Sequence, residues 1–416
     1  LTAHDLILVA FTSAADAPLV SGVVGVLKSR SPLQELIIAD LACPSFGEFT
    51  GDFPVVITAF NDHPPTMEIV PQIIFGGVGA NGILPITQGN ISEGAGFQTK
   101  TLKRFSYGMP EEAGISAKGL QKIESVVQEA IREQATPGCY VLVAKDGKVV
   151  YQKAFGHLTY EKQTPVTDST IYDLASVTKV SATLQAIMFL NDRGLIDINK
   201  KASAYLPELK NSNKKDFTLK DILTHQAGLW PFLPFWVQTM KDSAHLPEYY
   251  QQEPSHQYPL MVADKLFASI SMKDSLWNWI IRARIREKPP RTPFDYRYSD
   301  MGFYILQHLA EKMLNQPVED FLEQNLYEPL GAYTMGYLPL LRFRIGRIAP
   351  TENDRLFRKA LLIGTVHDQG AAMHGGVAGH AGLFSNATDL AKLGQMLLQD
   401  GHYGGYQYYR PETVRL

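Results

Sequence analysis

Short apolar runs alternate with helical patterns over the first ninety residues. Three runs have the length of buried strands, namely Leu6–Phe11, Leu36–Ala39 and Val55–Ala59. Helical patterns lie between and after them, at Ala17–Ser29 and at Thr66–Phe75, the second ending at paired glycines. Strands that alternate with helices in this way are typical of a parallel sheet with covering helices. Residues 1–90 are therefore predicted to form a partial α/β doubly wound domain.

A different pattern follows a linker at residues 91–104, which the Gly- and Ser-rich stretch Gly89–Gln98 indicates. Two β-rich runs, Cys139–Ala144 and Lys148–Tyr151, flank the dipeptide Asp146-Gly147, which is a strong hairpin signal. Helical patterns occur at Ser116–Gln134, Ser176–Arg193, Leu219–Leu223, Tyr304–Leu314 and Asp389–Leu398. These patterns predict a second domain over residues 105–416 with an α+β fold, an antiparallel sheet with a helical layer.

Composition and charge exclude several classes of protein. Lys and Arg number 39 against 42 Asp and Glu, and the net charge of −3 gives no reason to expect nucleic acid as a partner. No apolar run approaches the roughly 20 residues that cross a bilayer. Cys43 and Cys139 lie far apart and form no metal-ligand spacing. The chain starts at Leu1 with no signal peptide, so we expect it to begin inside a domain.

Aromatic side chains crowd the Pro-punctuated stretch between Leu229 and Phe294. They are Trp230, Phe232, Phe235, Trp236, Tyr249, Tyr250, Trp277 and Trp279. Such a stripe most often belongs to a core. Its closeness to the motifs described next leaves a second interpretation open, a wall facing the substrate, with Trp230 as the candidate contact.

The string Tyr172–Lys179 contains Ser176 and Lys179, three residues apart at the start of a helical pattern. This spacing places the two side chains on one face, about one turn apart. A serine hydroxyl needs a neighbouring base or cation to become a nucleophile, and an ammonium near Oγ favours the alkoxide. The positive end of the helix acts in the same direction. Ser-x-x-Lys alone is also ordinary helix composition, so the motif needs support from elsewhere.

Support comes from Tyr298-Ser299-Asp300, which directly precedes another helical pattern. Tyr298 would supply a second base, and Asp300 a side chain able to bond Lys179 or a substrate amide. The alternative is a buried tyrosine with a structural hydrogen bond. Convergence of the two motifs favours the catalytic interpretation.

With these motifs the chain resembles the serine β-lactamases, penicillin-binding proteins and related esterases, especially the class C-like branch. The matching stretches, in the family's order, are Pro137–Tyr151, Ile171–Lys179, Leu223–Leu229, Tyr298–Gly302 and Gly379–Ser385. The resemblance implies that Ser176 is the acylated nucleophile, Lys179 its activator and Tyr298 the general base. Asp300 stands where many members have Asn, which favours an esterase- or peptidase-like relative over a β-lactamase in the narrow sense.

The family's third motif, Lys- or His-Thr-Gly on a strand facing the nucleophile, normally lies beyond the segment that resembles Gly379–Ser385. Because the sequence stops at Leu416, we expect this strand to lie outside the chain. The strand would supply a second oxyanion donor, and losing one such donor typically costs about 10²–10³ in rate. The fragment could then be inactive although its parent is an enzyme.

A loop rich in glycine and histidine raises the question of a metal. His367, Asp368, His374 and His380 are ligand types, but their spacing matches no zinc pattern. Hydrogen bonds that fix the loop are the favoured interpretation, with a substrate-side role for His380. We expect no metal ion and no other cofactor.

Residues 1–90 resemble the C-terminal α/β domain of glycoside hydrolase family 3, through Pro54–Asp62 and Gln72–Thr87. The resemblance implies a β-N-acetylhexosaminidase-like parent whose barrel would precede Leu1 and would be an intramolecular partner. A generic doubly wound domain is the alternative. The pairing of both resemblances points to muropeptide substrates and to a bacterial cell envelope or periplasm.

The sequence thus predicts a serine hydrolase that cleaves an amide or ester through an acyl-enzyme. Muropeptide amidase or D-amino-acid peptidase, esterase and β-lactamase compete for the substrate assignment. Two other interpretations stay open. One is a catalytically silent module that recognises penicillin or muropeptides, and the other is an accessory part of a glycosidase.

Overall fold

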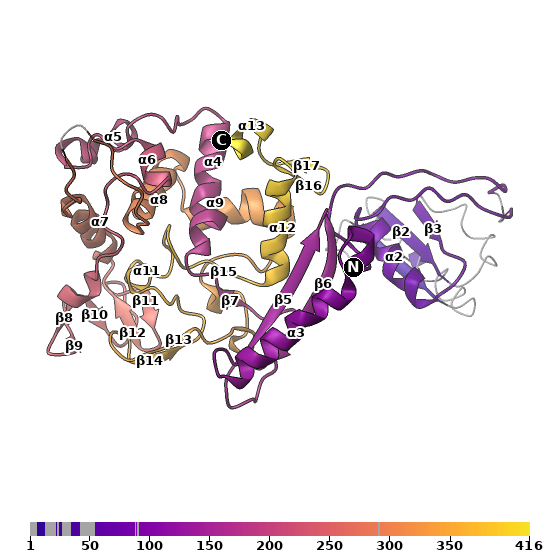
Figure 1. Cartoon of the computed structure of the whole chain (residues 1–416), viewed down its shortest axis with the longest axis horizontal. Helices are drawn as coiled ribbons and strands as arrows, with labels where there is room; N and C mark the ends of the chain where they lie inside the picture. Colours follow the sequence, from indigo (N-terminus) through magenta and orange to yellow (C-terminus); the bar gives the residue numbers. More distant parts are fainter. Residues whose placement is uncertain are drawn as a thin grey trace. The chain divides into compact units, whose positions relative to one another are not determined.

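The structure is a computed structural model of the chain that describes residues 6–12, 22, 25–26, 35–41, 55–87, 89, 91–289 and 292–416. The chain divides into two compact units (Figure 1). One comprises Leu1–Gly108 with Asp146–Val149, and the other comprises Met109–Lys145 and Val150–Leu416. The second unit contains all the motifs with candidate chemistry.

The first unit contains a parallel three-stranded sheet in the order β1 (Leu6–Phe11), β2 (Glu35–Asp40) and β3 (Val55–Thr58). Helix α2 (Pro64–Ile74) follows β3, and the sheet and helix share a core of Ala39, Leu41 and Val70 with partly buried Ile57, Ala59 and Ile74. The three predicted strands and the parallel pattern are confirmed. The predicted helix Ala17–Ser29 lies almost entirely outside the described residues.

The second unit opens with the predicted helix and hairpin. Helix α3 (Ala117–Arg132) begins after Ser116, whose Oγ accepts a hydrogen bond from the Gly119 N–H at 3.2 Å. Strands β5 (Gly138–Lys145) and β6 (Lys148–Gly156) are neighbours in one sheet. The first two residues of β6 pair with β4 (Ser106–Tyr107), which belongs with them to the first unit. Positive φ angles of 53° and 76° at the two turn residues suit a type I′ hairpin turn.

Besides α3, helices are the commonest regular elements of the second unit. Its α-helices are α4 (Leu184–Asp192), α5 (Ala202–Tyr205), α6 (Leu219–Leu223), α7 (Met272–Arg282), α8 (Met301–Leu314), α9 (Val318–Leu322), α10 (Glu328–Leu330), α11 (Gln369–Met373), α12 (Ala387–Leu398) and α13 (Pro411–Arg415). Helix α4 packs against α8, α9 and α13, and α12 packs on β5 (Figure 1). Where α6 meets α8, Gly302 is needed, because a Cβ there would lie 2.6 Å from Ile222 Cγ2.

Shorter elements complete the unit. Two-stranded pairs are β7 (Tyr172–Asp173) with β15 (Phe384–Ser385), β8 (Met240–Lys241) with β9 (Ala244–His245), β13 (Glu352–Asp354) with β14 (Ala360–Leu362) and β16 (His402–Tyr403) with β17 (Tyr406–Gln407). Strands β10 (Tyr250–Gln251), β12 (Leu266–Ala268) and β11 (Leu260–Ala263) form a three-stranded sheet. Short 3₁₀ turns lie at Pro110–Ala113, Pro207–Asn211, Phe235–Thr239, Pro339–Leu341 and Ile345–Arg347. The unit thus combines helices with small, largely antiparallel sheets, as predicted.

The predicted helix Ser176–Arg193 differs from the structure at its beginning. Ser176 lies in a turn, and a π-helical turn at Lys179–Thr183 precedes α4. Two contacts from distant segments engage this turn: Tyr327 Oη donates to the Ser181 carbonyl at 2.8 Å, and Thr183 Oγ1 donates to the Gly379 carbonyl at 2.7 Å. A second π-helical turn occurs at Glu323–Tyr327. Such turns are rare and often mark functional sites.

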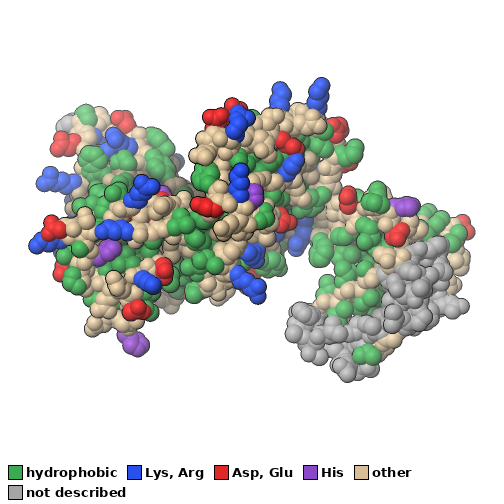
Figure 2. Space-filling view, turned by 90° about the horizontal axis from the view of Figure 1, so that it is seen from below, with side chains coloured by type: hydrophobic (Ala, Val, Ile, Leu, Met, Phe, Trp, Pro, Cys, Tyr) green, Lys and Arg blue, Asp and Glu red, His purple; other side chains and the backbone are tan. Residues whose placement is uncertain are grey.

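The aromatic segment is partly core and partly surface. Phe235 and Tyr250 are buried, whereas Trp230 and Phe232 are more than 40% exposed. On the face drawn in Figure 2, Lys and Arg side chains are interspersed with Asp and Glu, in line with the small net charge. Within the described part of the chain, every helix is too short or too polar to cross a bilayer.

Candidate active site

Ser176 is exposed at the corner where β7 leads into the π-helical turn. The corner is a tight turn: the N–H of Ala175 donates to Asp173 Oδ1 at 2.8 Å, and the N–H of Leu174 donates to the carbonyl of Leu383 at 2.9 Å. Ala175 has a φ angle of +44°, a left-handed conformation that is uncommon for a residue with a Cβ. The hydroxyl of Ser176 is thereby held at an accessible turn rather than inside a helix.

Lys179 is almost fully buried, and three oxygens surround its ammonium. Nζ donates hydrogen bonds to Ser176 Oγ and to the carbonyl of His380, each at 3.0 Å. It also forms an ion pair with Asp300, 2.6 Å from Oδ1. Two hydrogen bonds and one ion pair thus hold the ammonium of Lys179. The positive charge of Lys179 therefore lies directly beside the Ser176 hydroxyl, as the spacing of the motif predicts.

Hydrogen bonds connect the segment Tyr298–Asp300 to the loop after α6. The N–H of Ser299 donates to Nδ1 of His225 at 3.1 Å, and its Oγ donates to the Trp230 carbonyl at 2.6 Å. The N–H of Asp300 donates to the Pro231 carbonyl at 2.9 Å. These bonds fix the position of the Asp300 carboxylate against Lys179. Burial lowers the pKa of His225, and the charge of Lys179 acts in the same direction.

Tyr298 and Trp230 are the exposed aromatic residues of the site. The ring of Tyr298 lies beside that of His225, with centroids 4.7 Å apart, and its centroid is 5.0 Å from Lys179 Nζ. Tyr298 is 41% exposed and Trp230 is 42% exposed. The backbone carbonyl of Trp230 accepts the hydrogen bond from Ser299 Oγ and so lies next to the Tyr298–Asp300 segment.

The Gly379–Ser385 segment packs against the Ser176 corner. The N–H of Leu383 donates to Thr178 Oγ1 at 3.1 Å, and β15 pairs with β7 directly before the Ser176 corner. A Cβ at Gly379 would lie 2.2 Å from the Phe303 carbonyl oxygen, so only glycine allows this approach. The close approach brings the His380 carbonyl to Lys179.

The side chain of His380 anchors its own loop. Nε2 lies 2.8 Å from Oδ1 of Asp368, and the ring packs on Tyr304 of α8 with centroids 4.4 Å apart. Asp368 also caps α11 by accepting from the Ala371 N–H at 2.7 Å. The structure thus places the carbonyl of His380, rather than its ring, against Lys179. Burial acts to raise the pKa of Asp368, but the neighbouring His380 and the helix-cap bond hold that pKa well below its usual range.

Asp368 therefore contributes stability that depends on pH. Its folded-state pKa lies below the unfolded value of about 3.9, so the contribution is complete above about pH 4 and is lost as the pH falls further. We expect Asp368→Asn to be less stable than the wild type by about 1–3 kcal/mol at pH 7. Denaturant unfolding of both proteins between pH 7 and pH 2 measures this gap, which should narrow below about pH 4.

The matched control is Asp264→Asn, at an exposed aspartate in the turn between β11 and β12. Its unfolding curve should follow that of the wild type at every pH. A gap for Asp368→Asn that is constant down to pH 2 would contradict the ion pair with His380.

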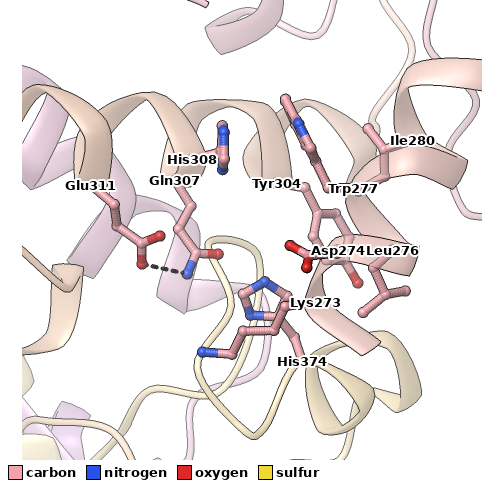
Figure 3. A pocket seen from close by; sticks show the side chains of 10 residues that line it. All are labelled: Lys273, Asp274, Leu276, Trp277, Ile280, Tyr304, Gln307, His308, Glu311 and His374. Carbon is pink, nitrogen blue, oxygen red and sulfur yellow. Dashed lines mark hydrogen bonds between the residues drawn. The ribbon is translucent and has the colours of Figure 1, made fainter. Parts of the chain in front are cut away.

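Behind Tyr304 lies a separate cavity of about 220 Å³ between α7, α8 and the end of α11 (Figure 3). It is lined by Lys273, Asp274, Leu276, Trp277, Ile280, Tyr304, Gln307, His308, Glu311 and His374. Gln307 donates to Glu311 at 2.9 Å, and Nδ1 of His374 lies 2.7 Å from the Val377 carbonyl oxygen. Burial lowers the pKa of His374 to about 4.

The structure brings most of the predicted site residues together. Ser176, Lys179 and Asp300 are in contact, and His380 joins them through its carbonyl. Of the four residues weighed as metal ligands, Asp368 and His380 pair with each other, whereas His367 and His374 contact other groups. In the described part of the chain no three His, Cys, Asp or Glu side chains are grouped as a metal site. Sequence reasoning missed Asp173 and Tyr304. Asp173 stands inside the Tyr172–Lys179 motif and so carried a signal, whereas nothing in the sequence pointed to Tyr304.

Comparison with known proteins assigns the family. The profile of a family described as Beta-lactamase matches residues 123–413. A protein of Escherichia coli (strain K12) named "Putative D-alanyl-D-alanine carboxypeptidase" is 30% identical over 339 residues, 74% of this chain and 70% of its own length. An N-acetylmuramyl-L-alanine amidase of Bacillus subtilis (strain 168) is 31% identical over 337 residues, 74% and 69% of the two chains.

Solved structures agree on the fold. EstCE1, a hydrolase with promiscuous acyltransferase activity, has a TM-score of 0.52 at 21% identity, covering 71% of this chain and 75% of its own. A penicillin-binding protein homologue from Pyrococcus abyssi has a TM-score of 0.51 at 21% identity, covering 71% and 59%. The chain belongs to the beta-lactamase family, and it is a serine hydrolase of the β-lactamase and penicillin-binding-protein type. Nothing in these comparisons supports the glycosidase resemblance of residues 1–90, which stays a prediction.

Proposed function

We propose that Ser176 is the nucleophile and forms an acyl-enzyme. Its Oγ bonds to the carbonyl carbon of the substrate, the C–N or C–O bond to the leaving group breaks, and the hydroxyl proton passes to that leaving group. Water then adds to the carbonyl carbon of this ester, the bond between that carbon and Ser176 Oγ breaks, a proton from water returns to Oγ, and the acid product leaves. The 3.0 Å hydrogen bond between Lys179 Nζ and Ser176 Oγ is the observation that carries this proposal.

In this proposal Lys179 stabilises charge and Tyr298 transfers the proton. Lys179 stabilises negative charge on Oγ, and Asp300 with the His380 carbonyl holds the ammonium in place. Tyr298, whose ring is close to Lys179, receives and returns the proton. Within the described chain the N–H of Ser176 has no hydrogen-bond partner, although the four neighbouring N–H groups at residues 174, 175, 177 and 178 do. That N–H is available to stabilise the oxyanion.

The proposed substrates are cell-wall peptides. The relatives are named for the D-alanyl-D-alanine bond and for the bond between N-acetylmuramic acid and L-alanine, so both carry an amide next to alanine. The exposed Trp230 and Tyr298 would form the wall on which such a peptide lies. A cell-envelope or periplasmic location follows from the same substrates.

The proposal is tested by comparing how fast the full-length gene product hydrolyses cell-wall peptides, an ester and a β-lactam. We expect a peptide ending in D-Ala-D-Ala or an N-acetylmuramyl-L-alanyl peptide to be cleaved with a higher kcat/KM than p-nitrophenyl acetate or a chromogenic cephalosporin. Cleavage of the ester alone would contradict the cell-wall assignment. Saturable muropeptide binding without turnover would support a recognition module instead.

We also propose that the chain contains two domains, residues 1–90 and 105–416, joined by the linker 91–104. The parallel sheet β1–β2–β3 and α2 support an α/β domain over the first of these. Under this proposal residues 1–90 are the glycoside hydrolase family 3-like domain, and a glycosidase barrel is its intramolecular partner. Deleting residues 105–416 should leave the glycosidase activity of the parent protein unchanged, and its loss would contradict independent modules.

A further inference from the structure

Asp173 uses both oxygens of its carboxylate to bind backbone N–H groups from two different segments. Oδ1 accepts from Ala175 at 2.8 Å, inside the Ser176 corner. Oδ2 accepts from His367 at 2.7 Å, almost two hundred residues further along the chain. Burial raises the pKa of Asp173, and the two N–H groups oppose that shift by stabilising its charged form. Asp173 therefore links the Ser176 corner to a distant loop.

The corner needs such a link because its backbone is strained. A left-handed conformation costs a residue with a Cβ roughly 1–2 kcal/mol, and Ala175 has a φ angle of +44°. The peptide between Ala175 and Ser176 carries the N–H that is free to face an oxyanion. A relaxed Ala175 would turn this peptide and move Oγ of Ser176 away from Lys179.

The distant loop is itself held by a buried ion pair. Arg358 has no exposed side-chain surface, and its Nε donates to Asp354 Oδ2 at 2.7 Å. Its guanidinium donates to the carbonyl of Val366 at 2.6 Å and also to the carbonyl of His367. Burial acts to raise the pKa of Asp354, but the hydrogen bonds from Arg358 and the backbone lower it to about 2. The His367 N–H that binds Asp173 belongs to the same peptide group as the Val366 carbonyl, so the hydrogen bond from Arg358 fixes the orientation of that N–H.

We propose that Asp173 is a positioning residue for acylation: it connects the buried Arg358–Asp354 pair to Ala175 and so holds Ser176 in its reactive orientation. The inference rests on the proposed function, since it concerns the orientation of the same nucleophile. Asp173 acts through the backbone of Ala175 and takes no part in proton transfer. Its loss should therefore slow the chemical step and leave reagent binding nearly unchanged.

Labelling by a fluorophosphonate measures the two quantities separately. The Ser176 oxygen bonds to phosphorus, fluoride leaves and the hydroxyl proton goes to the site base, with kinact for the chemical step and KI for binding. We expect Asp173→Ala to lower kinact about 30- to 100-fold with KI within threefold, since small misplacements at a reacting centre cost about 10². Asp173→Asn should lose about tenfold, because an amide retains only one of the two acceptors.

A second substitution tests whether the effect passes through Ala175. Glycine adopts positive φ without strain, so in an Ala175→Gly background the link matters less. There, adding Asp173→Ala should lower kinact less than about fivefold. The matched control is Asp197→Asn: Asp197 Oδ1 accepts from the Asn199 N–H at 2.9 Å in the same type of local turn, after α4. Its kinact should equal that of the wild type.

Three outcomes overturn the inference. One is a kinact for Asp173→Ala and Asp173→Asn within twofold of the wild type. The second is an equal loss from Asp173→Ala in both backgrounds, which would mean that Ala175 does not transmit the effect. The third is a loss confined to KI. Failure of the folded wild type to react at all is a different result, which contradicts the proposed function of Ser176 itself.

Discussion

Replacing Ser176 by alanine is expected to abolish covalent labelling by fluorophosphonate and to lower amide hydrolysis by at least about 10³-fold. The reason is that, among the residues that the structure describes, Ser176 provides the only hydroxyl bonded to Lys179, with Oγ 3.0 Å from Nζ. Residual hydrolysis would come from binding and from the backbone N–H alone. Because Ser176 is exposed, its loss should leave the free energy of unfolding within about 0.5 kcal/mol of the wild type.

Ser255→Ala is the matched control for this variant. Ser255 is also exposed, and its Oγ accepts a local hydrogen bond from the Tyr258 N–H at 3.3 Å. The control should label at the wild-type rate. If Ser176→Ala were labelled as fast as the wild type, the nucleophile would be a residue other than Ser176.

Replacing Lys179 by methionine should produce the second large effect, on both rate and stability. The lysine side chain is 4% exposed and its partner Asp300 is 19% exposed, so the variant leaves a largely buried carboxylate without its cation. Removing one member of a buried pair typically costs about 3–5 kcal/mol. Labelling should fall by at least about 10²-fold, because Oγ loses the charge that stabilises it.

The double variant Lys179→Met with Asp300→Asn separates these two roles. Removing the carboxylate charge should restore most of the lost unfolding free energy, measured by denaturant titration, but none of the labelling rate. A double variant that regains labelling would show that Lys179 serves only to neutralise Asp300.

Local patterns were sufficient to predict much of the fold. The strands Leu6–Phe11 and Val55–Ala59 follow from short apolar runs, and the β5–β6 hairpin follows from Asp146-Gly147, whose backbone adopts the turn expected for that pair. The π-helical turn at Lys179–Thr183 was not predictable, because it coincides with bonds from Tyr327 and to Gly379, both far away in the sequence.

In the candidate site, too, local contacts were predictable and contacts between distant segments were not. The contact between Ser176 and Lys179 follows from their spacing, and Asp300 was expected near Lys179 from the motif that contains it. The partners of Asp173 and His380 were not expected, because they depend on where the loop after β14 lies. Spacing along one segment is visible in a sequence, whereas a hydrogen bond between two loops depends on the folded backbone.

The most direct test of the central claim is to locate the acyl group. The full-length protein is incubated with a penicillin, quenched in acid and examined by intact mass and peptide mapping. The account predicts an adduct with the mass of the whole penicillin, since the ring opens and nothing leaves, on the peptide that contains Ser176. An adduct on any other residue, or a folded protein that acquires none with penicillin or with fluorophosphonate, would contradict it.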